Sequence, residues 1–84
     1  MTTEEVIAIL CRNVCYLRKK YQLSQESMAM SMQIDVKDLQ LMEAGVLSDE
    51  VTADTLIRLQ KVFRISISTL FSTVLEETES RTTR

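Results

Sequence analysis

Apolar positions in the first quarter of the chain follow a helical period. They recur at steps of three and four residues, at Ile7, Leu10, Val14, Leu17 and Tyr21. Such spacing places these side chains on one face of an α-helix. Thr2 and Glu5 have the spacing of a capping box, so we expect the helix to start there. The pattern predicts a long helix that ends near Tyr21, buries this stripe and places Asn13 on the opposite side.

Two shorter apolar patterns follow, each behind a residue that favours a helix start. Ser24 precedes a segment whose predicted inner face is Met28, Ala29 and Met32. Asp35 precedes a second segment, which buries Leu39 and Met42 and ends before Gly45. Gln33 lies between the two, where a left-handed conformation would cost a non-glycine residue about 1 kcal/mol, so a modified turn is the alternative.

The second half of the chain predicts a loop and two more helices. The loop spans 46–51, and Thr52 caps a fourth helix that turns Leu56, Leu59 and Phe63 inward. Ser66 caps a fifth helix along "ISTLFSTVLEE". We therefore expect one domain over residues 1–75, followed by a polar, disordered tail over 76–84.

Composition agrees with an all-α fold. The 84 residues are 45% hydrophobic and 26% charged, with no Pro and one Gly, which is typical of a small globular chain rich in helix. No apolar run reaches the roughly 18 residues that span a membrane. The N-terminus is acidic before its apolar part, which is the wrong sign for a signal peptide. We expect a cytoplasmic protein that does not bind membranes.

Residues with metal or catalytic chemistry are scarce. The chain has no His, and its two cysteines, Cys11 and Cys15, lie one helical turn apart. Two thiols are too few for a zinc site, and a disulfide within one helical turn is strained. We interpret both cysteines as packing residues. No metal, cofactor or enzymatic activity is expected.

The stretch "LRKKYQLSQESMAMSMQIDVKDLQLMEAG" resembles the Cro and phage-repressor (XRE-type) helix-turn-helix family. "TLIRLQKVFRISISTLF" resembles the fourth and fifth helices of that family, so the similarity covers about residues 12–72. The resemblance implies a compact five-helix, lambda-repressor-like DNA-binding domain of prokaryotic or phage origin. The positions in register with the family pattern are Arg18, Leu23, Ser24, Gln25, Glu26, Met28, Ala29, Ile34, Leu39, Glu43 and Gly45.

The resemblance also implies a function. It predicts a sequence-specific transcriptional regulator that acts as a homodimer and inserts its third helix, about 36–43, into the major groove of double-stranded DNA. It further implies an ion pair between Arg18 and Glu43, although two solvated charges are the alternative. The residues expected at the DNA are Ser24, Gln25, Val36, Lys37, Asp38, Gln40 and Leu41.

The charge pattern favours a second hypothesis. Residues 24–45 contain one basic side chain, Lys37, against four acidic ones, whereas DNA-binding segments are usually basic. An ordinary exposed amphipathic helix therefore remains an alternative for 36–43. The loop 46–51 carries apolar and acidic residues and no cation, which suits a protein partner. The second hypothesis is a helix-turn-helix-derived interaction module that dimerises with or inhibits a regulator. The dimer-interface candidates are Val46, Leu47, Val51, Ile67, Val74 and Leu75.

Overall fold

The computed structural model describes residues 2–77, and all regular elements in this range are helices. A helical segment at 75–77 follows the five helices with defined bounds, so the expected five-helix count is not met. The five helices are α1 (Thr3–Lys20), α2 (Gln25–Met32), α3 (Val36–Glu43), α4 (Ala53–Phe63) and α5 (Ile67–Ser72).

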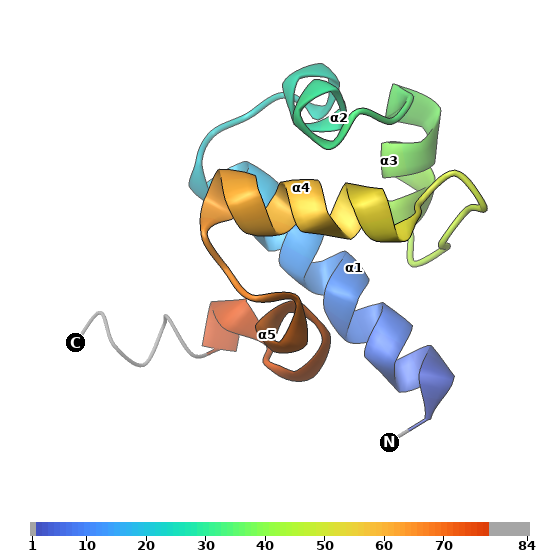
Figure 1. Cartoon of the computed structure of the whole chain (residues 1–84), viewed down its shortest axis with the longest axis vertical. Coiled ribbons are helices and arrows are strands. Elements are labelled where there is room, and N and C mark those ends of the chain that lie inside the picture. The colour runs from blue at the N-terminus through green and yellow to red at the C-terminus, as the bar shows by residue number, and fades with distance from the viewer. Residues whose placement is uncertain (1, 78–84) are drawn as a thin grey trace.

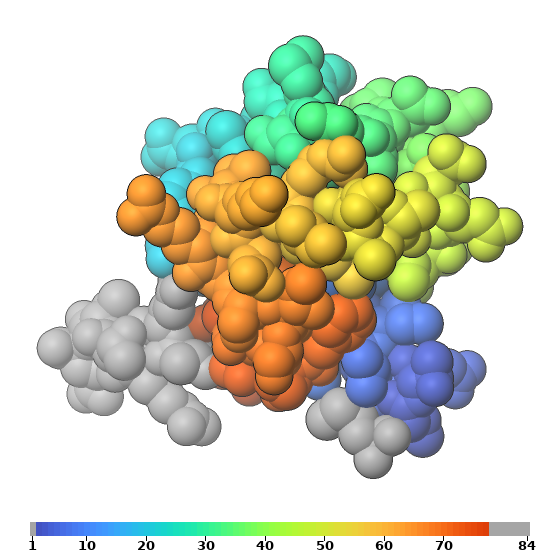
Figure 2. Space-filling model, viewed as in Figure 1, coloured from blue at the N-terminus to red at the C-terminus, as the bar shows by residue number. Residues whose placement is uncertain are grey.

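Helix α1 crosses the molecule diagonally and contacts elements at both of its ends (Figure 1). It packs against α3 at one end and most extensively against α5 at the other. Helix α4 crosses the front and packs against α2 and α5, and α2 also contacts α3. The result is a compact body with principal extents of 36 × 30 × 22 Å. In the space-filling view α4 lies exposed across this front face (Figure 2).

Most helix starts are capped as the sequence indicates. Thr2 and Glu5 bond reciprocally at 2.9 and 3.1 Å, and the Ser24 hydroxyl accepts from the Ser27 amide at 3.0 Å. Thr52 forms a capping box with Thr55, and Ser66 caps α5. Asp35 is the exception, because it precedes α3 without a side-chain cap bond.

Of the two alternatives for the turn between α2 and α3, the structure has the left-handed residue. Gln33 has φ 59° and ψ 44°, a conformation that costs a non-glycine residue roughly 1 kcal/mol. It allows the Ile34 amide to donate to the Ala29 carbonyl at 3.0 Å, which satisfies the end of α2. Gly45 takes the same role after α3, with φ 92°. The α2–α3 unit is therefore a pair of short helices closed by defined turns.

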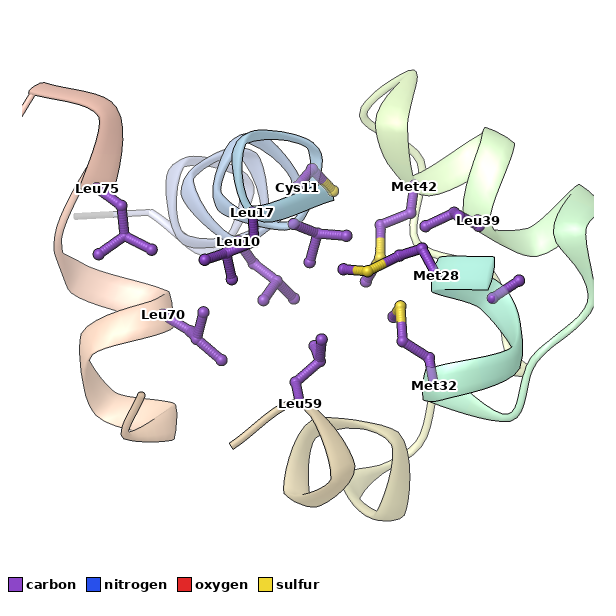
Figure 3. Packing of buried hydrophobic residues seen from close by; sticks show 12 residues of the cluster. Leu10, Cys11, Leu17, Met28, Met32, Leu39, Met42, Leu59, Leu70 and Leu75 are labelled. Carbon is purple, nitrogen blue, oxygen red and sulfur yellow. The ribbon is translucent and has the colours of Figure 1, made fainter. Parts of the chain in front are cut away.

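The core has two parts of different composition (Figure 3). Leucines gather where α1 faces α4, α5 and the 75–77 segment, whereas methionines gather where α1 faces α2 and α3. Tyr21, expected in the buried stripe, is instead 50% exposed and packs against Phe63 at 5.4 Å between ring centroids. The side chains of the methionine part are Met28, Met32 and Met42, and those of the leucine part are Leu10, Leu59, Leu70 and Leu75.

Asn13 differs from the sequence expectation in its burial and in its effect on the fifth helix. Its position in the sequence predicts the side opposite the buried stripe, but the residue is only 1% exposed. Its amide donates to the Leu70 carbonyl at 2.8 Å and the Thr73 carbonyl at 2.7 Å, and it accepts from the Leu75 amide at 3.0 Å. Because these main-chain groups bond to Asn13, the predicted fifth helix divides at residues 73–74 into α5 and the 75–77 segment.

The C-terminal boundary also changes. Leu75, expected at a dimer interface, is 6% exposed and belongs to the core. Residues 76 and 77 are helical, although the tail was expected to begin at 76. The remainder of that expected tail, 78–84, lies outside the described residues.

Candidate nucleic-acid interface

The site begins with an ion pair that joins α1 to the end of α3. The Nε atom of Arg18 lies 2.6 Å from Oε2 of Glu43, and Nη2 lies 3.1 Å from Oε1. Nη1 of Arg18 also donates to the Leu23 carbonyl at 3.1 Å, in the loop before α2. Only 17% of the Arg18 side chain and 11% of the Glu43 side chain are exposed. One guanidinium thus joins α1 to the loop before α2 and to the end of α3.

The environment of Glu43 keeps it charged. Burial raises the pKa of this carboxyl, but the hydrogen bonds from Arg18 and Gln25 and the charges of Arg18 and Lys19 outweigh it and lower the pKa. The same pair raises the pKa of Arg18, first through the hydrogen bond with Glu43. Both partners are therefore ionised at neutral pH.

Two further hydrogen bonds join Glu43 to Gln25 of α2, and Gln25 to the exposed side of α3. Nε2 of Gln25 donates to Oε1 of Glu43 at 3.2 Å. Oε1 of Gln25 in turn accepts from Nε2 of Gln40 at 3.2 Å. We name this series, Arg18–Glu43–Gln25–Gln40, the polar chain. The resemblance implies the ion pair, whereas no local pattern predicts the contact between Gln25 and Gln40, which lie 15 residues apart on two helices.

The N-terminus of α2 is organised for contact through its main chain. The Ser24 hydroxyl is engaged within the helix cap by the amide and the hydroxyl of Ser27. The first amides of any helix lack carbonyl partners within that helix, and they favour anions. Ser24 and Gln25 thus set the position of this helix start, and a phosphate would meet main-chain amides there.

The exposed face of α3 is formed by three of the predicted residues. Lys37, Gln40 and Leu41 surround a shallow hollow of about 320 Å³, and Leu41 is 43% exposed. Val36 is different, because it is half-buried and packs against the core. Asp38 is also half-buried. The structure therefore concentrates the available contacts on the face of Lys37, Gln40 and Leu41.

The predicted interface residues after α3 do not form one surface. Val46 is 51% exposed, whereas Leu47 and Val51 are half-buried and pack against the core. Ile67 and Val74 are also half-buried. Together with the burial of Leu75, this leaves Val46 as the most exposed of the six candidates.

The two cysteines line a hollow of about 420 Å³ between α1 and the end of α3, where Glu43 and Gly45 also line it. Cys11 is buried, which raises the pKa of its thiol, and Cys15 is half-buried. Within residues 2–77, no three His, Cys, Asp or Glu side chains are grouped to hold a metal ion. Neither cysteine forms a disulfide.

Comparison of the chain with protein-family models, with curated proteins and with solved structures finds no match. In the part of the chain that the structure describes, no helix combines the length and apolarity needed to cross a bilayer.

Proposed function

We propose that this protein is a DNA-binding transcriptional regulator whose α2 and α3 act as a helix-turn-helix. The observation that supports this proposal is the polar chain. It fixes the start of α2 and the outer face of α3 relative to α1 through the three hydrogen-bonded steps from Arg18 to Gln40. A rigid, exposed helix beside a helix N-terminus is the arrangement that enters a major groove.

The chemistry of the α3 face defines which bases it would meet. Lys37 is exposed and donates to guanine O6 or N7, and Gln40 presents an amide suited to adenine. Leu41 provides an apolar contact for a thymine methyl group. The first amides of α2 would receive a backbone phosphate, which fixes the register without selecting a sequence.

The acidic surroundings set the expected strength of binding. Along residues 24–45, Lys37 is the sole basic side chain against Glu26, Asp35, Asp38 and Glu43. Few phosphates would be neutralised, so affinity should be modest and should depend on base contacts more than on salt. Two copies on adjacent half-sites, as in the expected homodimer, would compensate for a weak single contact.

The test is fluorescence anisotropy on labelled duplex DNA, with a library selection to define sequence preference. We expect binding at about 50 mM salt that weakens toward about 200 mM. Lys37→Ala should change the preferred sequence, because its partner is a base. Gln25→Ala should weaken binding to all sequences alike, because it releases the start of α2 from Glu43.

Arg12→Ala is the matched control, because it removes one exposed positive charge from α1 outside the α3 face. It should leave sequence preference unchanged. Absence of binding at about 50 mM salt by the folded protein would refute the proposal. An equal response to Lys37→Ala and Arg12→Ala would show that α3 does not contact the bases.

A protein-interaction module is the second candidate, and the exposed apolar side chains beside the acidic residues favour it. Leu41 and Val46 lie on and just after α3, and Asp49 and Glu50 follow. For this function, Val46→Asp should abolish partner binding measured by calorimetry, while Lys37→Ala should have little effect. If the Val46→Asp protein still binds the partner, this surface is not part of the interface.

A further inference from the structure

Cys11 and Cys15 face one hollow from the same side of α1. Both residues line the hollow of about 420 Å³ between α1 and the end of α3. In Figure 3 the sulfur of Cys11 points from α1 toward the α3 side of the core. Neither thiol has a role in the DNA-binding function proposed for α2 and α3. The hollow therefore holds a pair of soft donor atoms that is separate from the exposed face of α3.

The two thiols have different surroundings. Cys11 is 4% exposed, and within residues 2–77 its thiol has no hydrogen-bond partner. Cys15 is half-buried, and its hydrogen bond with Arg18 is one of the contacts that raise the pKa of that guanidinium. One thiol is thus buried without a partner, and the other lies against a cation.

The spacing of the two cysteines suits a bridging ion better than a disulfide. Side chains four residues apart on a helix have Cβ atoms roughly 5–6 Å apart, whereas a disulfide brings the Cβ atoms to about 3.8 Å. An ion with metal–sulfur bonds of about 2.3 Å bridges two sulfur atoms that lie up to about 4.6 Å apart. The pair can therefore hold one ion without the unwinding of α1 that a disulfide would require.

The number and type of ligands select the ion. Within residues 2–77, no third His, Cys, Asp or Glu joins the two thiols in a group that could hold a metal. A structural zinc site takes four ligands, and calcium and magnesium take oxygen ligands. Soft sulfur donors favour Cu(I), an ion that two thiolates alone can satisfy. The sequence expectation of too few ligands thus applies to zinc and not to this class of ion.

We propose that Cys11 and Cys15 bind one Cu(I) ion per chain as a two-coordinate dithiolate. Each thiol releases its proton to solvent, and each sulfur donates an electron pair to the ion. Burial raises the pKa of the Cys11 thiol, so that thiol stays protonated until the ion displaces its proton. The hollow gives the ion a path from solvent to this buried sulfur.

Arg18 places the ion beside the polar chain. Its hydrogen bond with Cys15 would become charge-assisted, and so stronger, once the sulfur is a thiolate. The same guanidinium bonds to Glu43, which also lines the hollow. The bound ion would therefore link two turns of α1 next to the contact that joins α1 to α3. Metal binding needs no DNA, so this proposal is independent of the function proposed for α3.

The experiment titrates the full chain with Cu(I) under anaerobic conditions, in competition with a chromophoric Cu(I) chelator. Native mass spectrometry should show one copper per chain, and ultraviolet absorption should show charge transfer from thiolate to copper. X-ray absorption should find two sulfur neighbours around the copper and no other ligand. Zn²⁺ in place of Cu(I) should bind much more weakly, because two thiols supply only half of its ligands.

Cys15→Ser and Cys11→Ala each remove one ligand. Each should lower the affinity for Cu(I) by about a hundredfold or more, because the second thiol no longer adds its effective concentration. Cys15 is half-buried, so Cys15→Ser should keep the core intact, and circular dichroism checks that both variants are folded. Met30→Leu is the matched control, because it removes a sulfur that is 78% exposed. It should bind Cu(I) as tightly as the unchanged protein.

Three results would overturn the proposal. The first is a folded Cys15→Ser or Cys11→Ala protein that binds Cu(I) as tightly as the unchanged protein. The second is one copper shared by two chains, which would place the two sulfur ligands on different copies. The third is a copper with nitrogen or oxygen neighbours, or a Zn²⁺ affinity equal to that for Cu(I), which would exclude a two-coordinate dithiolate.

Discussion

Helix α1 is tied to the rest of the molecule at two polar contacts that differ in kind. Asn13 bonds to main-chain groups of Leu70, Thr73 and Leu75, whereas Arg18 reaches mainly the side chain of Glu43. A main-chain contact defines where helices begin and end, whatever side chains its partners carry. A contact between two side chains depends on the identity and protonation of both. The first should therefore govern the fold, and the second the setting of the candidate site.

Asn13→Leu should have the largest effect. It leaves two carbonyls and one amide without partners in a buried position, so the free energy of unfolding should fall by about 3 kcal/mol. Urea denaturation measures the loss, and amide exchange should show it concentrated near residues 70–77. Asn13→Asp keeps the acceptor for Leu75, but it should be at least as destabilising at neutral pH, because it places a buried carboxylate against the Leu70 and Thr73 carbonyls. A loss below about 1 kcal/mol for Asn13→Leu would mean that these main-chain groups find other partners.

Glu43→Ala should have a smaller effect, of about 2 kcal/mol, because hydrogen bonds to charged groups are worth more than neutral ones but this pair keeps some solvent contact. A double-mutant cycle with Arg18→Ala checks the assignment. The two losses should not add, since either substitution breaks the same contact. Additive losses would show that Arg18 and Glu43 stabilise the fold independently.

The smallest effect should appear in the response to acid. Because the folded pKa of Glu43 lies below its ordinary value of 4.5, its stabilisation is complete above that value and is lost as pH falls through the folded pKa. Unfolding measured between pH 6 and pH 3 should show a smaller loss in Glu43→Gln than in the unchanged protein. Glu5, whose pKa is also lowered by Thr2, leaves a residual dependence in both.

The Asn13 contact contains no titratable group, so a variant of Asn13 is the control for the pH dependence of unfolding. Asn13→Leu should lower stability equally across the pH range and keep the acid response. An unchanged acid response in Glu43→Gln would contradict the role given to the ion pair.

The parts of the fold that were predictable depend on local patterns. The apolar spacing from Ile7 to Leu17, the cap at Ser24 and the left-handed turn at Gln33 each depend on residues within one or two helical turns. Exposure of Lys37, Gln40 and Leu41 also follows from their spacing along α3. Local spacing is therefore enough to define the helices and the outer face of α3.

The missed features depend on partners far away in the sequence. Asn13 lies 57–62 residues from the groups that it contacts, and one polar residue in a helix looks solvent-exposed from sequence alone. The adjacent Thr73 and Val74 carried a signal, because β-branched residues weaken a helix and the break lies there. Of the polar chain, the ion pair between Arg18 and Glu43 was predicted, but the contact between Gln25 and Gln40 was not, since these residues meet only once the helices have packed.

The methionines between α1 and the α2–α3 unit have a consequence for how this region adapts (Figure 3). Met28, Met32 and Met42 are completely buried, and unbranched thioether side chains fill space in many conformations at similar energy. The shape of these methionine side chains alone therefore does not fix the angle between α1 and the α2–α3 unit. The angle of α3 against α1 is set instead by polar contacts, because Arg18 and Gln25 both bond to Glu43 at the end of α3. Loss of Glu43 would therefore leave α3 resting on a layer of side chains that tolerates more than one packing angle.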